Sequence, residues 1–523
     1  MRGEEDISND REYPRRIPPT AITTVDLELE ETNLFPTEDL LDIDENEELV
    51  GIGIFRFRFS LSSFRLGRGL SLRRFSIAEA ALLLMMAYIA SRGFGVIRQS
   101  MFNAIFGTGP EANAYYAAFR LPETLYNLIA GGALIQAFVP VFVSYEKHHG
   151  QTETWRLASL VFNVMLVTLT AIVLVAEFLT PSFVNKLLVP GYSPAEQALT
   201  TSLTRIVLVQ PLILGMATIA SGILSSKRQF LLPALSIAVY NFGLIGGLLF
   251  TLAIPGVGIY GPTYGVLAAA TCQLLVQVPG LLKQKLRYMF VWDLRHPGLH
   301  EVLRLLGPGA LSVAILSVGF IVDTAFTSFL ADQASLSALH NAQMLFALPV
   351  ALLAQAVAQA ALPRMSLLAT DGQYVHLRHL TQKVVGAAVL LSIPTAILLV
   401  VLGRPMIHLL FQHGAFDQHS SYLTFLALIG YAVGLPGNIA ADLLSRSFYA
   451  LKDARTPLLV NIFGLLVRFG LIVLLLKLLA GKSVLIAIPL AASGAGTAEA
   501  LMLGLLLFLR LRGRCREEKI HNG

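Results

Sequence analysis

Gln136-Ala-Phe-Val-Pro140 recurs 223 residues later as Gln359-Ala-Ala-Leu-Pro363. The same offset joins Leu188-Val-Pro-Gly191 to Phe411-Gln-His-Gly414 through their glycines. Glycine and proline are common in membrane helices, so each match alone is weak, but a shared offset indicates that one half of the chain repeats the other. Duplicated bundles are typical of transporters, whose substrate site lies between the two copies.

A third pair of residues keeps this register, because Pro233 and Pro457 each follow a basic turn and lie 224 residues apart. An offset that contains six helices leaves both copies in the same orientation, so the repeat is parallel. We expect two six-helix lobes, residues 77–298 and 299–511, related by an axis near the membrane normal. The lobes should face each other across a central cavity.

The composition places most of the chain in a lipid bilayer. Of its 523 residues, 55% are hydrophobic and only 14% are charged, with a mean hydropathy of +0.65, whereas soluble domains carry about 25% charged residues. A spanning helix needs about 20 apolar residues. The sequence therefore predicts an all-α polytopic membrane protein with about twelve transmembrane helices. Candidate spans begin near Ile77, Tyr126, Leu157, Ala198, Phe230, Tyr260, Val302, Leu339, Val384, Tyr422, Pro457 and Val484.

The charge is distributed unevenly along the chain. Residues 1–50 contain 16 acidic and 4 basic residues, a net charge near −12, which leaves about +17 for the rest of the chain. We expect residues 1–54 to be an acidic, disordered cytoplasmic segment; they lack the apolar region of a signal peptide. Residues 55–76 interleave arginine with phenylalanine and suit an anionic leaflet, either as a lipid-binding segment or as a simple positive-inside anchor. Positive charge in the membrane part indicates anionic ligands rather than nucleic acid.

Lys and Arg concentrate in the loops that follow even-numbered spans, and in a basic tail at residues 512–523. Such loops favour the cytoplasmic side, so we expect both termini to be cytoplasmic. The loop that contains Arg98 and Arg120 is an exception to this pattern. The loop residues that set the orientation include Lys147, Arg156, Lys227, Arg228, Lys283, Lys285, Arg287, Arg364, Arg378, Arg446, Lys452 and Arg455.

The first span ends in Ser91-Arg92-Gly-Phe-Gly-Val-Ile-Arg98. Six helical residues place the two arginines about 120° apart around the axis, so both can line one broad cavity. Guanidinium groups bind phosphate oxygens bidentately. We therefore expect Arg92, Arg98 and Arg120 to bind a lipid diphosphate. The alternative for Arg98, and equally for Arg120, is that the residue marks the outer membrane interface.

Polar residues in the second lobe suggest a coupling ion. Asp323 lies within the seventh span, and Asn438 and Asp442 share a face of the tenth. We expect these three residues, with Thr456, to form a cation-coupling site for a monovalent cation, sodium or a proton. The alternative is a buried structural network that includes Arg468 or Thr456. Further ionisable candidates within the spans are Glu79, Glu177, Arg205 and Glu499.

No catalytic chemistry is indicated. The two cysteines, Cys272 and Cys515, are isolated and lack the spacing of a metal or disulfide site. The sequence contains no Walker A motif, so we expect no ATP hydrolysis. The short loops lack the paired acids of a polyprenyl glycosyltransferase, which is the alternative from the enzyme class.

Several blocks of the sequence occur together, and the most specific are Ser91-Arg92-x-x-Gly95-x-x-Arg98 and Phe448-Tyr-Ala-Leu-Lys-Asp-Ala-Arg-Thr-Pro457. With these blocks the chain resembles the MurJ (MviN) family of lipid II flippases, members of the MOP exporter superfamily. The resemblance covers about residues 77–511 and implies the MOP fold. It also implies a bacterial inner-membrane protein that moves undecaprenyl-diphosphate-linked peptidoglycan precursor by alternating access, for cell wall biosynthesis and cell shape. Further matching blocks are Phe106-Gly-x-Gly109, Ala118-Phe-Arg-Leu-Pro122 and Gly132-Ala-Leu-Ile-Gln-Ala-Phe-Val-Pro140.

The chain also departs from the family pattern. Asn113 stands where the family usually has an acidic residue, Tyr126 where it has arginine, Gly131 where it has glutamate, and Ala342-Gln343-Met344-Leu345 where it has Ala-Asp-Arg-Leu. Two alternatives therefore stay open: another MOP exporter that moves a lipid-linked oligosaccharide or a drug by cation antiport, and a non-transporting scaffold. The expected partners are a lipid-linked sugar precursor, membrane lipids and the cell wall synthesis machinery.

Overall fold

The structure, a computed structural model, describes residues 77–227, 229–284, 287–332, 334–479 and 481–521. The segments expected at 1–54 and 55–76 lie outside these residues. Nearly all the described residues are helical, and no strand occurs among them, which confirms the predicted all-α class.

The first half of the membrane part, here called the N-lobe, is a bundle of helices interrupted by short breaks. Its breaks fall at glycine- or proline-rich positions, for example before Pro110 and at Gly131. Its helices are α1 (Ile77–Phe106), α2 (Pro110–Ala118), α3 (Arg120–Ile129), α4 (Gly132–His148), α5 (Gly150–Phe183), α6 (Pro194–Val207), α7 (Gln210–Ser226), α8 (Leu231–Ala253), α9 (Tyr260–Leu275) and α10 (Val278–Lys283).

The second half, the C-lobe, repeats this pattern of helices. For example, α6 and α15 begin at residues 194 and 418, and α8 and α17 at 231 and 455, so both pairs are 224 residues apart. The helix boundaries thus confirm the repeat predicted from the sequence. The C-lobe helices are α11 (Pro297–Ser328), α12 (Ser335–Val350), α13 (Ala356–Thr370), α14 (Tyr374–Phe411), α15 (Gln418–Val433), α16 (Leu435–Ala450), α17 (Arg455–Leu478) and α18 (Ala487–His521).

Eight continuous helical stretches among the described residues are long and apolar enough to cross a membrane. A ninth is the pair α15 and α16, which is bent by 49° at Gly434. In α11 the apolar part, Val313–Ser328, is too short to be counted among them. The chain is therefore polytopic, while the count of twelve spans stays a prediction.

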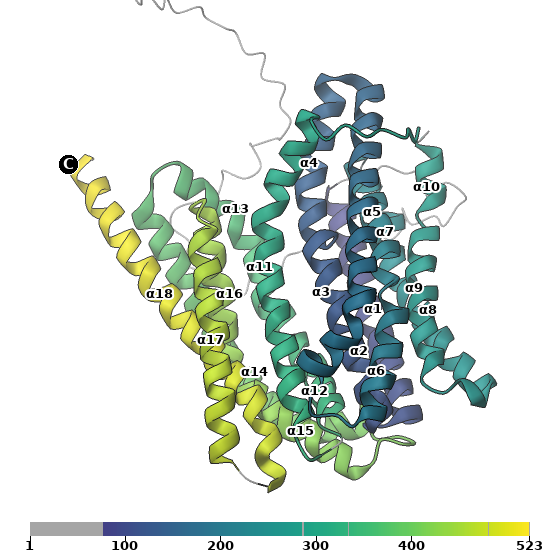
Figure 1. Cartoon of the computed structure of the whole chain (residues 1–523). Helices are drawn as coiled ribbons and strands as arrows, with labels where there is room; N and C mark the ends of the chain where they lie inside the picture. Colours follow the sequence, from purple (N-terminus) through teal and green to yellow (C-terminus); the bar gives the residue numbers. More distant parts are fainter. Residues whose placement is uncertain (1–76, 228, 285–286, 333, 480, 522–523) are drawn as a thin grey trace, which may run out of the picture. The chain divides into compact units, whose positions relative to one another are not determined.

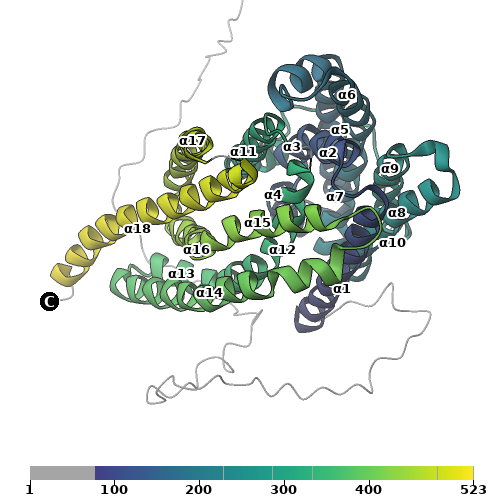
Figure 2. The same cartoon turned by 90° about the horizontal axis from the view of Figure 1, so that it is seen from below.

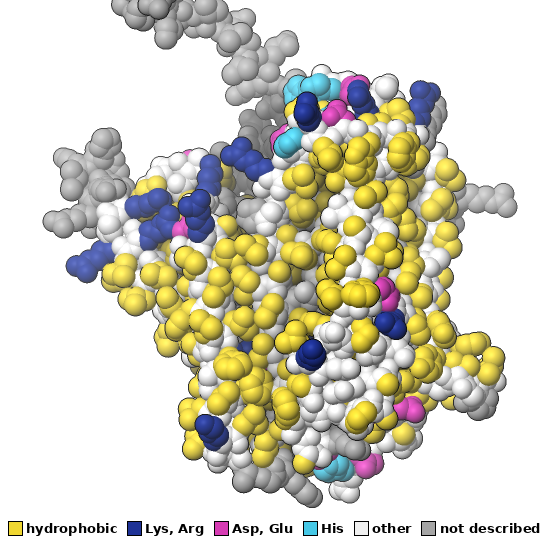
Figure 3. All heavy atoms as spheres, viewed as in Figure 1, with side chains coloured by type: hydrophobic (Ala, Val, Ile, Leu, Met, Phe, Trp, Pro, Cys, Tyr) yellow, Lys and Arg dark blue, Asp and Glu magenta, His cyan; other side chains and the backbone are white. Residues whose placement is uncertain are grey.

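Close helix packing within each lobe depends on small residues. In the N-lobe, α8 packs on α9 through Gly247, where a Cβ would lie 2.6 Å from the Cα of Gly265. Small residues let backbones approach in lipid, where no hydrophobic force drives helices together. Large apolar side chains instead face outward, such as Phe178 (84% exposed) and Leu409 (74%), and they cover the flank seen in Figure 3.

Figures 1 and 2 show the helices of the two lobes on opposite sides of a shared middle region. There α11 packs against α3 and α4, and α12 packs against α2. Lys and Arg side chains gather in the upper part of Figure 3, many of them near the C-terminal end of α18. The helix α18 continues through His521, so most of the expected tail at 512–523 is helical.

Candidate functional site

The three arginines singled out in the sequence line one cavity of about 650 Å³ between the lobes. Arg92 and Arg98 come from α1. Arg120 is the first residue of α3, a helix that begins in Arg120-Leu-Pro122; proline is tolerated in a first turn because its missing N–H has no helical acceptor there. The opposite wall comes from the C-lobe residues Phe320 and Gln343.

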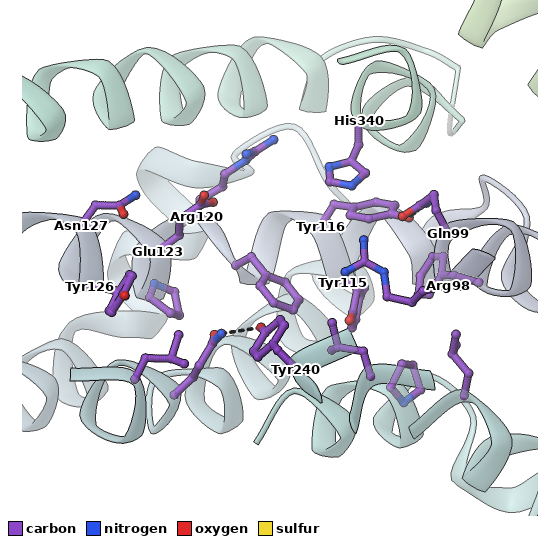
Figure 4. A pocket seen from close by; sticks show the side chains of 18 residues that line it. Arg98, Gln99, Tyr115, Tyr116, Arg120, Glu123, Tyr126, Asn127, Tyr240 and His340 are labelled. Atoms are coloured by element: carbon purple, nitrogen blue, oxygen red, sulfur yellow. Dashed lines mark hydrogen bonds between the residues drawn. The ribbon is translucent and has the colours of Figure 1, made fainter. Parts of the chain in front are cut away.

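A second compartment of about 350 Å³ adjoins this cavity within the N-lobe. The two share Arg98, Arg120, Glu123, Tyr240 and His340 as lining residues, and Figure 4 shows these side chains around the smaller compartment. We call the two compartments together the central cavity.

The arginines differ in their partners. Arg120 is fixed by the C-lobe, since its Nε donates to Thr324 Oγ1 at 3.0 Å and its guanidinium lies 5.4 Å from the centre of the Phe320 ring. Arg92 and Arg98 have no hydrogen bond or ion pair with any residue that the structure describes. Guanidinium groups without a carboxylate partner are free to bind an anion.

Glu123 is the acidic residue that lines both compartments, and sequence reasoning did not select it. The cavity therefore holds three guanidinium groups and one carboxylate. This excess of positive charge suits a ligand that carries more than one negative charge.

Near the cavity a polar network joins the lobes. Ser337 donates from its backbone N (2.8 Å) and its Oγ (2.6 Å) to Asn113 Oδ1. The Tyr116 ring stacks on His340 with centroids 4.0 Å apart. Each of these pairs joins residues 224 positions apart, so the axis of the repeat passes between them. The repeat register was thus the signal that would have placed His340 opposite Tyr116.

At one end of the molecule, here called the closed end, two reciprocal contacts hold the lobes together. Gly191 N donates to Ser328 Oγ at 3.0 Å, and Ala415 N, next to Gly414, donates to Ala104 O at 2.8 Å. A Cβ on either glycine would overlap the carbonyl group of Ser328 or Ala104. The glycines that anchor the sequence repeat are therefore required where each lobe touches the end of the other lobe's first helix.

The residues expected to bind a cation each have another partner in this structure. Asp323 pairs with Arg468, and Asp442 accepts from Arg446 at 3.3 Å. Thr456 Oγ1 donates to Asp453 at 2.7 Å at the start of α17, twelve residues from Arg468 and therefore about 18 Å along the helix.

Asn438 donates to Gly434 O at 2.9 Å within its own helix. No group of three His, Cys, Asp or Glu suited to a metal ion occurs among the residues that the structure describes. Thr456 is a helix-capping partner here rather than a neighbour of Asp323, and the cation-coupling role of Asp323, Asn438 and Asp442 stays a prediction.

Comparison with known proteins identifies the family. The model of the family described as "Lipid II flippase MurJ" matches residues 102–519. The chain belongs to the MurJ family. A "Probable lipid II flippase MurJ" of Rhizobium meliloti (strain 1021) is 30% identical over 434 residues, which cover 81% of this chain and 78% of that protein. The "Lipid II flippase MurJ" of Burkholderia cenocepacia is 30% identical over 385 residues, covering 72% and 74%.

Solved structures agree with this family and with the MOP fold. A structure of the lipid II flippase MurJ in an inward closed conformation matches with a TM-score of 0.69 and 25% identity, over 82% of this chain and 90% of that one. An inward-facing MATE multidrug transporter of the MOP superfamily matches with a TM-score of 0.70 at 14% identity, over 84% and 99%. The second match shows a shared fold.

The sequence departs from the family pattern at several positions. Two of them, Tyr126 and Gln343, line the central cavity, and both side chains are neutral. Tyr126 lines both compartments and its Oη lies 3.0 Å from Thr218 Oγ1, while Gln343 lines the larger one. Asn113 joins the lobes through Ser337. Among the described residues, the arginine and carboxylate side chains that line the central cavity are therefore Arg92, Arg98, Arg120 and Glu123.

Proposed function

We propose that this chain is a lipid II flippase, which moves undecaprenyl-diphosphate-linked peptidoglycan precursor across the bacterial inner membrane. The observation that carries the proposal is the central cavity between the lobes, into which Arg92 and Arg98 bring unpaired guanidinium groups. A diphosphate offers the oxygens that two such forks bind. Membership of the MurJ family supports the same substrate.

The protein acts by alternating access rather than by catalysis. Contacts at the closed end join the lobes around Gly191 and Gly414, so the diphosphate enters from the opposite end. Separation of these contacts, with closure at the opposite end, would release it on the other side. Transport then needs a rocking motion of two lobes about a fixed site, as in other repeat transporters.

The closed end faces the periplasm in this proposal. Its loops are those after odd-numbered spans, and basic side chains gather at the opposite edge in Figure 3, in accord with the positive-inside rule. Both chain termini are then cytoplasmic. The partners are the lipid-linked precursor, membrane lipids and, on the periplasmic side, enzymes of cell wall synthesis.

Complementation tests this function. A strain depleted of its own lipid II flippase should grow and keep its shape when this chain is expressed, and the Arg92→Ala variant should fail at equal membrane levels. The matched control is Arg205→Ala, which removes an arginine of α6 that pairs with Glu177 and does not line the central cavity. Failure of the wild-type chain at normal levels would count against the proposal.

A further inference from the structure

A carboxyl group lies at the middle of the apolar stretch that contains most of α18. Glu499 is fifteen residues from either end of the apolar stretch Val484–Arg514, which places it about 22 Å from each end. Ionisable groups at such depth are costly and usually functional. Neither the central cavity nor the closed end involves this residue.

The neighbouring helix is shaped to receive this carboxyl group. The Glu499 side chain packs directly on Gly464 of α17, where any Cβ would overlap it. Among the residues that the structure describes, none donates a hydrogen bond to the carboxyl group. Arg468, one helical turn after Gly464, is a positively charged group that interacts electrostatically with this carboxyl group.

Arg468 is already paired with another carboxylate. Its Nη2 donates to Asp323 Oδ2 of α11, and the Asp323 side chain is only 6% exposed. Asp323 Oδ1 and Arg468 Nε are both buried without a hydrogen-bond partner. A guanidinium has five N–H donors, so Arg468 has donors left for a second carboxylate.

We propose that Glu499 binds a proton, and that its protonation decides whether Arg468 pairs with Asp323 alone or is drawn to Glu499. With the proton bound, the three side chains sum to zero charge. Without it, the three side chains sum to one negative charge inside the membrane, and Asp323 and Glu499 compete for Arg468. This inference rests on the proposed transport function, for which it supplies the coupling ion.

The pair connects to the central cavity through α11. Thr324, next to Asp323, accepts from Arg120 Nε, and the Phe320 ring lies under the same guanidinium. A rearrangement of the Asp323–Arg468 ion pair therefore affects α11, the helix whose Thr324 and Phe320 position Arg120. By linkage, an anion bound in the cavity changes proton affinity at Glu499 as much as the proton changes anion affinity.

Other charged and titratable groups face this cluster as well. Tyr431 of α15 interacts with Asp323 and Arg468, and Arg120 of α3 interacts with Asp323. A proton fits Glu499 better than a metal ion, because a metal needs several oxygen ligands and the structure describes no group of acidic side chains around Glu499. At Asp323 a cation would have to displace Arg468.

Spin labels at Ala195 and Gln418 test the inference without a substrate. Both residues are exposed, and they occupy equivalent positions near the starts of α6 and α15 at the closed end. With Cys272 and Cys515 replaced by serine, the distance between the labels is measured across the titration range of buried carboxyl groups. We expect the wild-type distance distribution to shift with pH, and the shift to be lost in Glu499→Gln.

Two further variants make the test specific. Glu499→Asp keeps a carboxyl group and should keep the shift, and Glu177→Gln removes a carboxyl group elsewhere in the membrane part and should also keep it. A wild-type distribution that does not change with pH, or an equal shift in Glu499→Gln, would overturn the inference. Neither result bears on the proposed function, which fails only if the wild type does not complement the depleted strain.

Discussion

Arg92 and Arg98 line the central cavity and have no carboxylate or hydroxyl partner among the described residues. Arg120, Arg205, Arg446 and Arg468 each have such a partner. The side chains of Arg92 and Arg98 therefore add no hydrogen bond or ion pair to the fold among the described residues. The unpaired arginines are therefore the residues whose substitution should affect ligand binding more than folding.

Substituting Arg92 should weaken the binding of a polyprenyl diphosphate. Each hydrogen bond to a charged group contributes about 1.5–3 kcal/mol, so Arg92→Ala should lower affinity by about 10- to 100-fold. Arg92→Lys should recover part of it, because an ammonium lacks the bidentate fork. Binding of labelled lipid to purified protein measures this, and equal affinity of all three proteins would exclude the diphosphate role.

A second residue-scale prediction concerns the cap of α15. Asp417 Oδ1 accepts from the Oγ and N of Ser420, both at 2.7 Å, and the Ser420 hydroxyl donor is the main cause that lowers the pKa of Asp417. Asp417→Ala should cost about 1 kcal/mol of stability.

The pH dependence of this effect has a definite sign. A carboxylate with a lowered pKa stabilises the fold above its unfolded-state pKa, near 4, and loses this stabilisation as the pH falls through the folded value. Thermal unfolding in detergent should therefore show a difference between wild type and Asp417→Ala at neutral pH that shrinks below about pH 4. A difference that grows on acidification would contradict the capping role.

At the scale of elements, the repeat explains why two loops carry glycine. The turns after α5 and α14 each bring a backbone against the end of the other lobe's first helix. Gly414 has φ +58°, in the left-handed region, whereas Gly191 is required only by the close approach. Gly150 has φ +78° and open space within 4 Å of the place that a Cβ would occupy, so only its backbone conformation requires glycine.

These three glycines separate two effects on stability. Gly150→Ala should lower the free energy of unfolding by about 1 kcal/mol through φ alone. Gly191→Ala should loosen the closed end, because the added Cβ overlaps Ser328. Gly414→Ala should have both effects. Thermal unfolding measures the loss of stability, and labelling of a cysteine at Ala195 measures the loosening of the closed end. If all three variants destabilise equally and none changes labelling, the closed end does not depend on these contacts.

Much of this element arrangement could be predicted from sequence, because Gln136 to Pro140 and Gln359 to Pro363 preserve the register of the duplication. The arginines of the first span were also identifiable, since helical geometry alone allows Arg92 and Arg98 to face one cavity. The surroundings of the predicted cation site were harder to predict from the sequence. Asp323 pairs with Arg468 on another helix, and spacing along one helix says nothing about which distant side chain reaches across.

Thr456 shows the opposite difficulty. Its nearest partner, Asp453, lies three residues away and caps α17, a local contact that spacing could have suggested. Glu123 and His340 were missed because a cavity wall is assembled from α3 and α12 together. Only the repeat register, which places His340 opposite Tyr116, carried information about that wall.

At the scale of the whole molecule, orientation follows from the distribution of Lys and Arg. Cysteines introduced near Gly150, Lys227 and Asp371 should be shielded from an impermeant thiol reagent in intact cells, and a cysteine at Gln418 should react. Lysed cells provide the control, because all four positions are then accessible. Labelling of the first three from outside, with protection of Gln418, would reverse the orientation.

The central claim is that this MurJ family member flips lipid II through the cavity of Arg92 and Arg98. Its most direct test is the purified protein in proteoliposomes that contain lipid II with a fluorescent head group, exposed to an impermeant quencher. The wild type should make inner-leaflet lipid accessible much faster than in protein-free vesicles, and Arg92→Ala should lower the rate at least tenfold while Arg205→Ala does not. A folded wild-type protein that leaves the rate at the protein-free value would contradict it.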